Sequence, residues 1–282
     1  VIDVPAERVK SMPALLGEAD LVKTLQQLPG VAVGTEGMTG LYVRGGGADE
    51  NLYLLDGNPV YHVNHLLGFF SAFNPDAIKN TRFYKGSFPA EYGGRLSSVV
   101  DVRMNDGNRQ EYHGNISVGL LSARANLEGP IVKDRSSFNV SVRRTWLDLI
   151  TGTALAVVNK NSSIKDVFGY HFFDINAKLN HSFSDRSRAY LSFYMGQDAF
   201  RQGSKEKNGD SEDMFLWRWG NLIGSAGWNY VFGQKLFGNL MVGYSRFRSH
   251  IRQEVGGYEI YAGKEGKESF KRETTINRRW RI

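Results

Sequence analysis

Residues 40–103 of the chain read GLYVRGGGADENLYLLDGNPVYHVNHLLGFFSAFNPDAIKNTRFYKGSFPAEYGGRLSSVVDVR. Short runs of β-favouring residues alternate here with glycine-rich turns. Residues 40–44 and 52–56 are predicted strands, and the turn GGGADEN between them predicts a hairpin. Two further strands are predicted at residues 81–84 and 97–103. The stretch therefore predicts the sheet of a small domain.

Two short helices are predicted around that sheet. Apolar residues recur at helical spacing in residues 21–28, and Pro29-Gly30 ends the pattern. Asn74-Pro75-Asp76 has the composition of a helix start, which predicts a brief helix reaching Lys79. Together these elements predict an α+β domain over residues 1–105, with a mixed sheet of roughly four strands.

After residue 106 the pattern changes to long segments in which apolar and polar residues alternate, as they do in β-strands. Ser192, for example, stands between Leu191 and Phe193. The predicted strands cover residues 111–120, 122–129, 136–147, 170–183, 188–200, 214–232, 236–250 and 270–282.

The connections between these strands alternate in length. The short turns IVKDRS, SDRS and FGQK alternate with long polar connections at residues 150–168, 201–213 and 251–269. Transmembrane barrels have short periplasmic turns and longer external loops. A soluble β-sandwich also alternates, but it turns its apolar residues inward, whereas a barrel turns them outward. The lengths predict a membrane barrel, and the sandwich stays open as the alternative.

Neighbouring arginines in the predicted strands follow the same alternation. In Arg143-Arg144 and Arg278-Arg279, one residue of each pair is expected in the polar lumen and the other on the outer face. An outward arginine costs about 2 to 4 kcal/mol at the bilayer midplane and much less near the interface. We therefore expect these residues near strand ends.

The composition agrees with a β-rich protein and excludes several other classes. The chain has 282 residues, 32 glycines, 12% aromatic residues and no cysteine, which excludes disulfides and thiolate metal sites. No apolar run approaches the roughly 20 residues of a transmembrane helix. The net charge of +6 is scattered along the chain, which does not favour nucleic-acid binding. The first residues lack a signal-peptide pattern, so we expect the sequence to begin inside a mature protein.

The strand count bears on how much of a barrel is present. An eight-stranded barrel is filled by its own side chains, whereas plugged lumens occur in barrels of about 22 strands. The expected fold class is therefore a membrane all-β barrel with an N-terminal α+β plug domain. Residues 1–105 form the plug, and residues 106–282 form about eight strands, an incomplete first part of a roughly 22-stranded antiparallel barrel. The polypeptide is expected to continue past Ile282.

Four motifs, in a fixed order, resemble the plug and first barrel strands of TonB-dependent outer-membrane receptors. They are LVKTLQQLPGV, then LYVRGGG with NLYLLDGNPVY, then FYKGSFPAEYGGRLSSVVDV, and finally NLEGPIVKDRSSFNVSVR. The set is most similar to the subgroup that carries a carboxypeptidase-regulatory-like β-sandwich domain ahead of the plug, a domain absent from this sequence.

The resemblance assigns a charge cluster to the plug. Arg44 and Lys85 match two positions that pair with barrel glutamates in the family. The family usually has arginine at the second position; lysine keeps the charge but loses the planar fork of the guanidinium. The partner glutamates are expected beyond Ile282. The residues matching the structural motif of the plug are Gly45, Asp56, Gly57, Gly86, Tyr92 and Gly93.

Residues 61–73 join two strands of the plug and are aromatic and amphipathic. They are expected either to face the external ligand or to pack on the barrel wall. The residues concerned are Tyr61, His62, Asn64, His65, Phe69 and Phe70. His62 and His65 are three apart, but without a neighbouring carboxylate in the sequence they do not predict a metal site.

The resemblance implies TonB-dependent active uptake of a small or oligomeric ligand across the Gram-negative cell outer membrane. Its partners would be the TonB complex, through a segment N-terminal to this chain, and outer-membrane lipid; a surface lipoprotein and a signalling domain stay open. No cofactor, nucleic acid or catalysis is expected, because no catalytic motif stands out. The alternative function is that of a soluble or surface-anchored β-rich binding protein, an adhesin or glycan-binding module.

Overall fold

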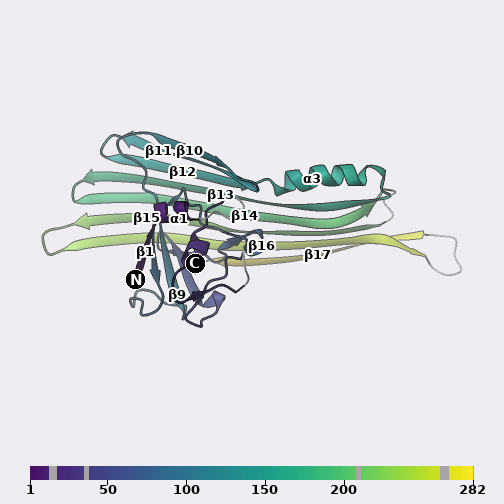
Figure 1. Cartoon of the computed structure of the whole chain (residues 1–282), viewed down its shortest axis with the longest axis horizontal. Helices are drawn as coiled ribbons and strands as arrows, with labels where there is room; N and C mark the ends of the chain where they lie inside the picture. The colour runs from purple at the N-terminus through teal and green to yellow at the C-terminus, as the bar shows by residue number, and fades with distance from the viewer. Residues whose placement is uncertain (13–17, 35–37, 208–210, 261–266, 282) are drawn as a thin grey trace.

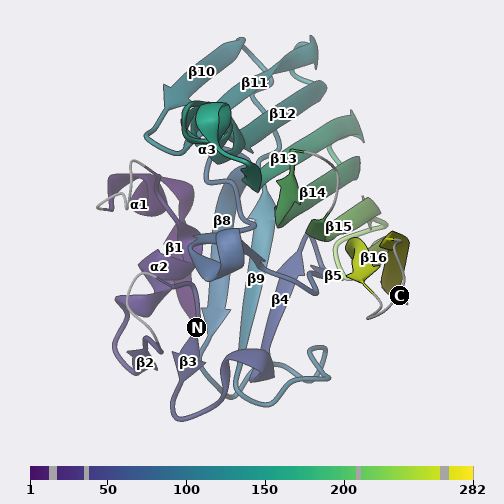
Figure 2. The same cartoon turned by 90° about the vertical axis from the view of Figure 1, so that its right-hand side faces the viewer.

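The structure is a computed structural model that describes residues 1–12, 18–34, 38–207, 211–260 and 267–281. Two sheets dominate it. A five-stranded sheet belongs to the N-terminal region and an eight-stranded sheet to the rest of the chain. The longest of the eight strands run the length of the molecule (Figure 1), and the eight together form an arc with the N-terminal elements on its inner side (Figure 2). This confirms the predicted class, an open part of a β-barrel with an N-terminal α+β domain.

The N-terminal sheet has the order β1-β8-β9-β4-β5. The strands are β1 (Ile2–Pro5), β4 (Asn51–Leu55), β5 (Asn58–Pro59), β8 (Ile78–Tyr84) and β9 (Ser98–Met104). β4 runs parallel to β9, and the other neighbours are antiparallel. The sheet is therefore mixed, as predicted.

Two helices, α1 (Ala6–Ser11) and α2 (Leu21–Gln26), pack with this sheet. α2 begins where predicted because the side chain of Asp20 caps it, accepting the Lys23 N–H at 3.1 Å. Its apolar residues Leu21 and Leu25 are fully buried in one core with Phe83 of the sheet. Burial of this apolar face, rather than helix propensity, stabilises so short a helix.

The predicted hairpin between residues 40–44 and 52–56 is wrong. β3 (Tyr42–Val43) pairs instead with β2 (Val31–Ala32), while β4 pairs with β5 and β9. The intervening glycine turn folds into a 3₁₀ turn, η1 (Ala48–Glu50), closed by the Gly47 N–H on the Glu50 carboxylate at 2.8 Å. The chain leaves that turn toward β9, since the parallel pairing with β9 buries β4 inside the sheet, between β9 and β5.

The brief helix predicted at residues 74–79 is also wrong. Asn74 does accept the Asp76 N–H at 3.1 Å, and the Ala77 N–H reaches the Asn74 carbonyl at 3.0 Å. One turn forms, and β8 then begins at Ile78. Pairing of β8 with β1 and β9 wins over helix extension.

The eight-stranded sheet is a meander in which each strand pairs antiparallel with the next. Its strands are β10 (His113–Val118), β11 (Ser122–Val132), β12 (Ser136–Thr145), β13 (Ile164–Ser184), β14 (Ser187–Glu206), β15 (Glu212–Val231), β16 (Phe237–Ile260) and β17 (Lys267–Arg281). Short turns follow β11, β13 and β15 at one edge of the sheet, as predicted.

The long polar connections are shorter than predicted. α3 (Leu147–Val158) and the turn η3 (Asn159–Asn161) fill the first, and β13 to β16 extend into all three. The extensions are polar but paired: Lys205 lies opposite Glu212, with 3.6 Å between ammonium and carboxylate. Among the described residues, no helix is long and apolar enough to cross a bilayer.

The two faces of the eight-stranded sheet differ in polarity. Ser141, Asn176 and Tyr194 lie in one cross-strand row, face the N-terminal domain and are at most 3% exposed. The opposite face carries exposed apolar side chains: Leu127, Val140, Val142, Leu179, Leu191, Phe193, Leu240 and Val242. Apolar residues outside and polar residues inside are the arrangement that the membrane prediction requires and that the sandwich alternative excludes.

Candidate functional site at the domain interface

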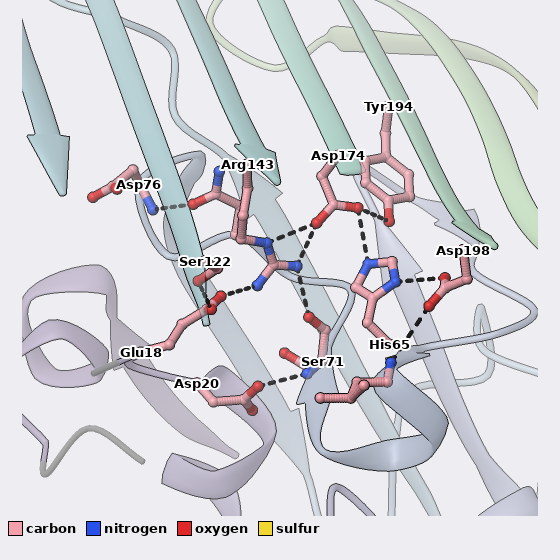
Figure 3. Close-up of polar contacts among 12 residues, drawn as sticks. Glu18, Asp20, His65, Ser71, Asp76, Ser122, Arg143, Asp174, Tyr194 and Asp198 are labelled. Atoms are coloured by element: carbon pink, nitrogen blue, oxygen red, sulfur yellow. Dashed lines mark hydrogen bonds and ion pairs between the residues drawn. The ribbon is translucent and has the colours of Figure 1, made fainter. Parts of the chain in front are cut away.

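A buried ionic network joins the N-terminal domain to the eight-stranded sheet (Figure 3). At its centre is Arg143 of β12, only 2% exposed. Its Nε donates to Asp174 of β13 at 2.7 Å, its Nη1 donates to the carboxylate of Glu18, and its Nη2 donates to the Ser71 carbonyl at 2.8 Å. The guanidinium also lies 5.0 Å from the ring centroid of Phe172. One barrel cation thus holds two separate segments of the N-terminal domain.

His65 makes the second half of the network. Its Nδ1 lies 2.7 Å from Asp198 of β14, and its Nε2 lies 2.9 Å from Asp174. The imidazole stacks on Phe172 with 4.3 Å between centroids and 4° between planes. Tyr194 donates to Asp174 at 3.0 Å. A protonated His65 would satisfy both carboxylates, because both ring nitrogens are then donors.

The sequence brings these groups together through strand register. Arg143 and Asp174 are direct cross-strand partners on β12 and β13. The residue opposite Asp174 on β14 is Gly196, where a Cβ would lie 2.2 Å from the Tyr194 hydroxyl and 2.6 Å from the Asp174 carboxylate. The missing side chain makes room for the tyrosine to reach the aspartate. The loop from the N-terminal domain then turns sharply, since Leu66 and Leu67 both have positive φ.

The surroundings of His65 favour its protonated form. Burial by itself would lower the pKa of this imidazole, but the charges and hydrogen bonds of Asp174 and Asp198 outweigh it and raise the pKa to about 9. Because this pKa is above the usual 6.5, the protonated form stabilises the interface fully below about pH 6.5. The contribution is lost progressively as the pH rises through 9.

We expect the free energy of unfolding of the N-terminal domain to fall by about 2 kcal/mol in total between pH 7 and 9, because the slope approaches its limit of about 1.4 kcal/mol per pH unit only between the two pKa values. The measurement is a urea titration of the full-length protein, followed by the fluorescence of Trp219, whose ring lies 6.1 Å from that of His62. His65→Gln should remove this slope. His113→Gln, at an exposed position, should leave it unchanged; equal slopes in wild type and His65→Gln would contradict the assignment.

Arg44 and Lys85, the predicted charge cluster of the plug, have other contacts. Lys85 donates to the Pro29 carbonyl at 2.7 Å, and Arg44 has positive φ and lies beside Gly86. In the described part of the chain, neither side chain forms an ion pair. Their cluster with barrel glutamates stays a prediction.

The predicted structural motif lies in turns. Gly45 and Gly57 have positive φ, as does Gly86. Asp56 does more than shape its turn: it accepts the Met104 N–H at 3.1 Å and lies 3.2 Å from the ammonium of Lys178 on β13. It thereby forms a second buried ion pair between the domains.

Tyr92 and Gly93 line a cavity of 1040 Å³. The cavity lies between the N-terminal domain and the parts of β14, β15 and β16 that are nearest the short turns. Its wall also includes Tyr61, His62 and Asn64. Burial by its surroundings, followed by the charge of Asp101, raises the pKa of Tyr92, whose hydroxyl lies 3.4 Å from that carboxylate.

The remaining residues of the predicted loop pack on the barrel wall. His65 and Phe70 are buried there, whereas Phe69 is 40% exposed. His62 packs between Trp219 and Phe247, and burial lowers its pKa. Among the described residues, no group of three or more histidine, aspartate or glutamate side chains is arranged to hold a metal ion.

The comparisons with known proteins concern both parts of the chain. Residues 5–100 match the family model of the TonB-dependent receptor plug domain. No curated protein matches. The solved structures include the siderophore receptor PirA from Acinetobacter baumannii, with 15% identity, a TM-score of 0.49 and coverage of 99% of this chain and 47% of that chain.

Two other solved structures are similar. A mutant of the ferric enterobactin receptor PfeA from Pseudomonas aeruginosa has 15% identity and a TM-score of 0.47, covering 98% of this chain and 48% of that one. The outer membrane transporter YddB from Escherichia coli has 12% identity and a TM-score of 0.48, covering 98% and 52%. The chain therefore spans about half the length of the structures it matches.

Proposed function

We propose that this chain, which belongs to the TonB-dependent receptors of the Gram-negative outer membrane and carries their plug domain at residues 5–100, serves the active uptake of a ligand across that membrane. Residues 1–105 are the plug, and residues 106–282 are about eight strands, the first part of the barrel. At rest the plug closes the lumen. When TonB pulls on a segment N-terminal to this chain, the plug rearranges and the ligand passes.

The observation that carries the proposal is the buried network of Arg143 with Glu18, Asp174 and His65. It fixes the plug on the polar inner face of the barrel with ion pairs and hydrogen bonds, beside apolar contacts such as that of Phe70 with Phe172. The polar contacts are exchanged for water at low net cost once they are hydrated, whereas they are strong while dry. An interface of this kind suits a plug that closes the lumen at rest and separates from the barrel wall when it is pulled.

The cavity of 1040 Å³ indicates at which end of the barrel the ligand leaves. Its wall is formed by plug residues such as Tyr61 and Tyr92 and by barrel residues such as Tyr190 and Asn239. These barrel residues lie near the turns after β13 and β15, the periplasmic edge of the sheet. We place the exit of the passage here, and the ligand-facing side of the plug at the opposite edge.

The closed lumen can be tested without knowing the ligand. The full-length receptor is reconstituted in a planar lipid bilayer, and the potassium chloride current is recorded for wild type and for a deletion of residues 1–105. We expect a closed wild type and a large steady conductance in the deletion variant, because the polar inner face then lines open water. A wild-type receptor that conducts like the deletion variant would overturn the closing role.

The TonB step has its own test. The full-length receptor is mixed with the periplasmic domain of TonB, and retention is compared with that of a receptor from which the residues preceding Val1 have been removed. Loss of retention in the truncated receptor supports the proposal. Equal retention of both would place the TonB contact elsewhere and contradict it.

A further inference from the structure

Several arginines on the outer face of the barrel lie together without acidic partners. We call them the arginine belt: Arg201 of β14, Arg218 of β15, and Arg246 and Arg248 of β16. Their outward direction follows from register. Arg246 lies opposite Leu222, and Leu222 lies opposite Met195, so the three form one cross-strand row. Along each strand, the residues of this row alternate with residues that are buried toward the lumen, and the row therefore faces outward.

In the described part of the chain, no carboxylate lies within 4.0 Å of a guanidinium of the belt. Other outward arginines do have such partners: Arg144 pairs with Asp148 at 3.0 Å, and Arg252 pairs with Glu273 at 3.2 Å. The Nε of Arg246 is buried and makes no hydrogen bond. Arg248 stands directly opposite a further arginine, Arg279 of β17, and like charges in that position repel. The belt thus lacks an anion.

A hollow of 340 Å³ lies within the belt. Arg218, Arg246, Arg248, Met195 and Leu222 line it. Gly220 also lines it, paired with Gln197 on one side and Arg248 on the other. A Cβ at Gly220 would lie 2.2 Å from the carbonyl oxygen of Gly196, so no side chain can stand there. The hollow is therefore built into the backbone, with three guanidinium groups at its rim.

The belt lies at the boundary of the apolar band. Nearer the short turns, the outward residues of β16 are Leu240, Val242 and Tyr244, and Arg246 follows them. The apolar residues begin at the exposed Leu236, directly before β16. From Leu236 to Arg246 the chain rises roughly 33 Å, the length that an apolar band about 25 Å tall covers along a strand tilted by about 40°. The belt is on the side away from the short periplasmic turns, which is the outer leaflet.

From this geometry we propose that the arginine belt binds lipopolysaccharide of the outer leaflet through the phosphates of its lipid A. Guanidinium groups bind phosphate through two parallel hydrogen bonds. A lipid whose phosphates stand above its acyl chains places the anion at Arg246 and Arg248 and the chains on Leu222, Val242 and their neighbours. The proposal rests on the barrel assignment and is independent of uptake.

The test titrates the purified full-length receptor in detergent with deep-rough lipopolysaccharide and reads binding by native mass spectrometry. The variant is Arg246→Gln/Arg248→Gln, and the matched control is Lys133→Gln/Arg144→Gln, which also removes two charges but from outside the belt. We expect the belt variant to bind at least tenfold more weakly and the control to bind like wild type. Equal binding by all three proteins would overturn the proposal.

Comparison ligands separate the sources of the anion. Dephosphorylated lipid A should bind wild type at least tenfold more weakly than the phosphorylated form. Inorganic phosphate or phosphatidylglycerol that competes as well as lipopolysaccharide would overturn the proposal, because the belt would then be an unspecific anion surface. Arg248→Lys keeps the charge without the fork and should give intermediate binding. Heat-modifiable migration on gels verifies that each variant is folded, and lipopolysaccharide should raise the Tm of wild type but not of Arg246→Gln/Arg248→Gln.

Discussion

Arg143→Met should loosen the plug by about 3 to 5 kcal/mol, the cost of removing one partner from a buried ionic group. The methionine fills most of the volume but leaves Glu18 and Asp174 buried without their common cation. It also removes the hydrogen bond to the Ser71 carbonyl. The measurement is the urea midpoint for release of the plug in the full-length receptor, followed by the fluorescence of Trp219. With a slope of 1 to 3 kcal/mol per molar urea, the midpoint should fall by more than about 1 M.

Arg144→Met is the matched control, since the two residues are neighbours on one strand and differ in the face they occupy. Arg144 is exposed and forms a single ion pair with Asp148, so its removal should cost about 1 kcal/mol or less. Similar losses for both variants would show that the buried network does not hold the plug.

A double-mutant cycle separates the two carboxylate partners of Arg143. Glu18→Gln alone leaves the guanidinium bound to Asp174, whereas Arg143→Met/Glu18→Gln also removes one of the stranded charges. The double variant should therefore be more stable than the sum of the single losses predicts, by about 0.5 to 3 kcal/mol. Additive losses would mean that Glu18 and Arg143 act independently.

The barrel strands could be predicted from the sequence because their signal is local. Alternation around Ser192 and the short turns after β11, β13 and β15 are visible in any short window. Strand ends were harder to predict, since β13 to β16 continue as polar, paired strands beyond the apolar band. The helix α3 was missed because half of its residues are β-branched or glycine, which disfavour helix, and because it buries no side chain and so shows no amphipathic period.

The N-terminal sheet shows why local signals fail elsewhere. A hairpin and a parallel pairing compete for β4, and the choice depends on β9, which comes 43 residues after β4 ends. The sequence between them contains no feature that states the outcome. Long-range pairing of this kind is decided by burial of the whole sheet.

The ionic network was missed for a different reason. In a barrel every second strand residue faces a polar lumen, so Arg143, Asp174 and Asp198 look like many other inward polar residues. What distinguishes them is cross-strand register and the loop that brings His65 between the two aspartates. The one usable signal was the pair Arg143-Arg144, for which alternation predicts one buried and one exposed guanidinium, as observed.

A cross-link between plug and barrel should arrest the plug at a defined point when it is pulled. Asn58 of β5 donates to the Ser225 hydroxyl of β15, and both side chains are buried. Asn58→Cys/Ser225→Cys is joined by a short, reducible bis-thiosulfonate in the full-length receptor in a bilayer. The N-terminal end is then pulled with optical tweezers while the potassium chloride current is recorded. Wild type should release residues 1–105, roughly 360 Å of chain, and then conduct.

The linked variant should release only residues 1–57, roughly 200 Å, and stay closed. β8 and β9 remain paired in the lumen in that case, since both follow the linked Asn58 along the chain. Reduction should restore the full extension and the current. A second linked pair, Asp106→Cys/Ser137→Cys, anchors the chain after the plug, where Ser137 donates to the Asp106 carbonyl at 2.7 Å, and should behave like wild type. A current that appears in the linked Asn58→Cys/Ser225→Cys receptor would mean that the passage opens without removal of the central plug strands.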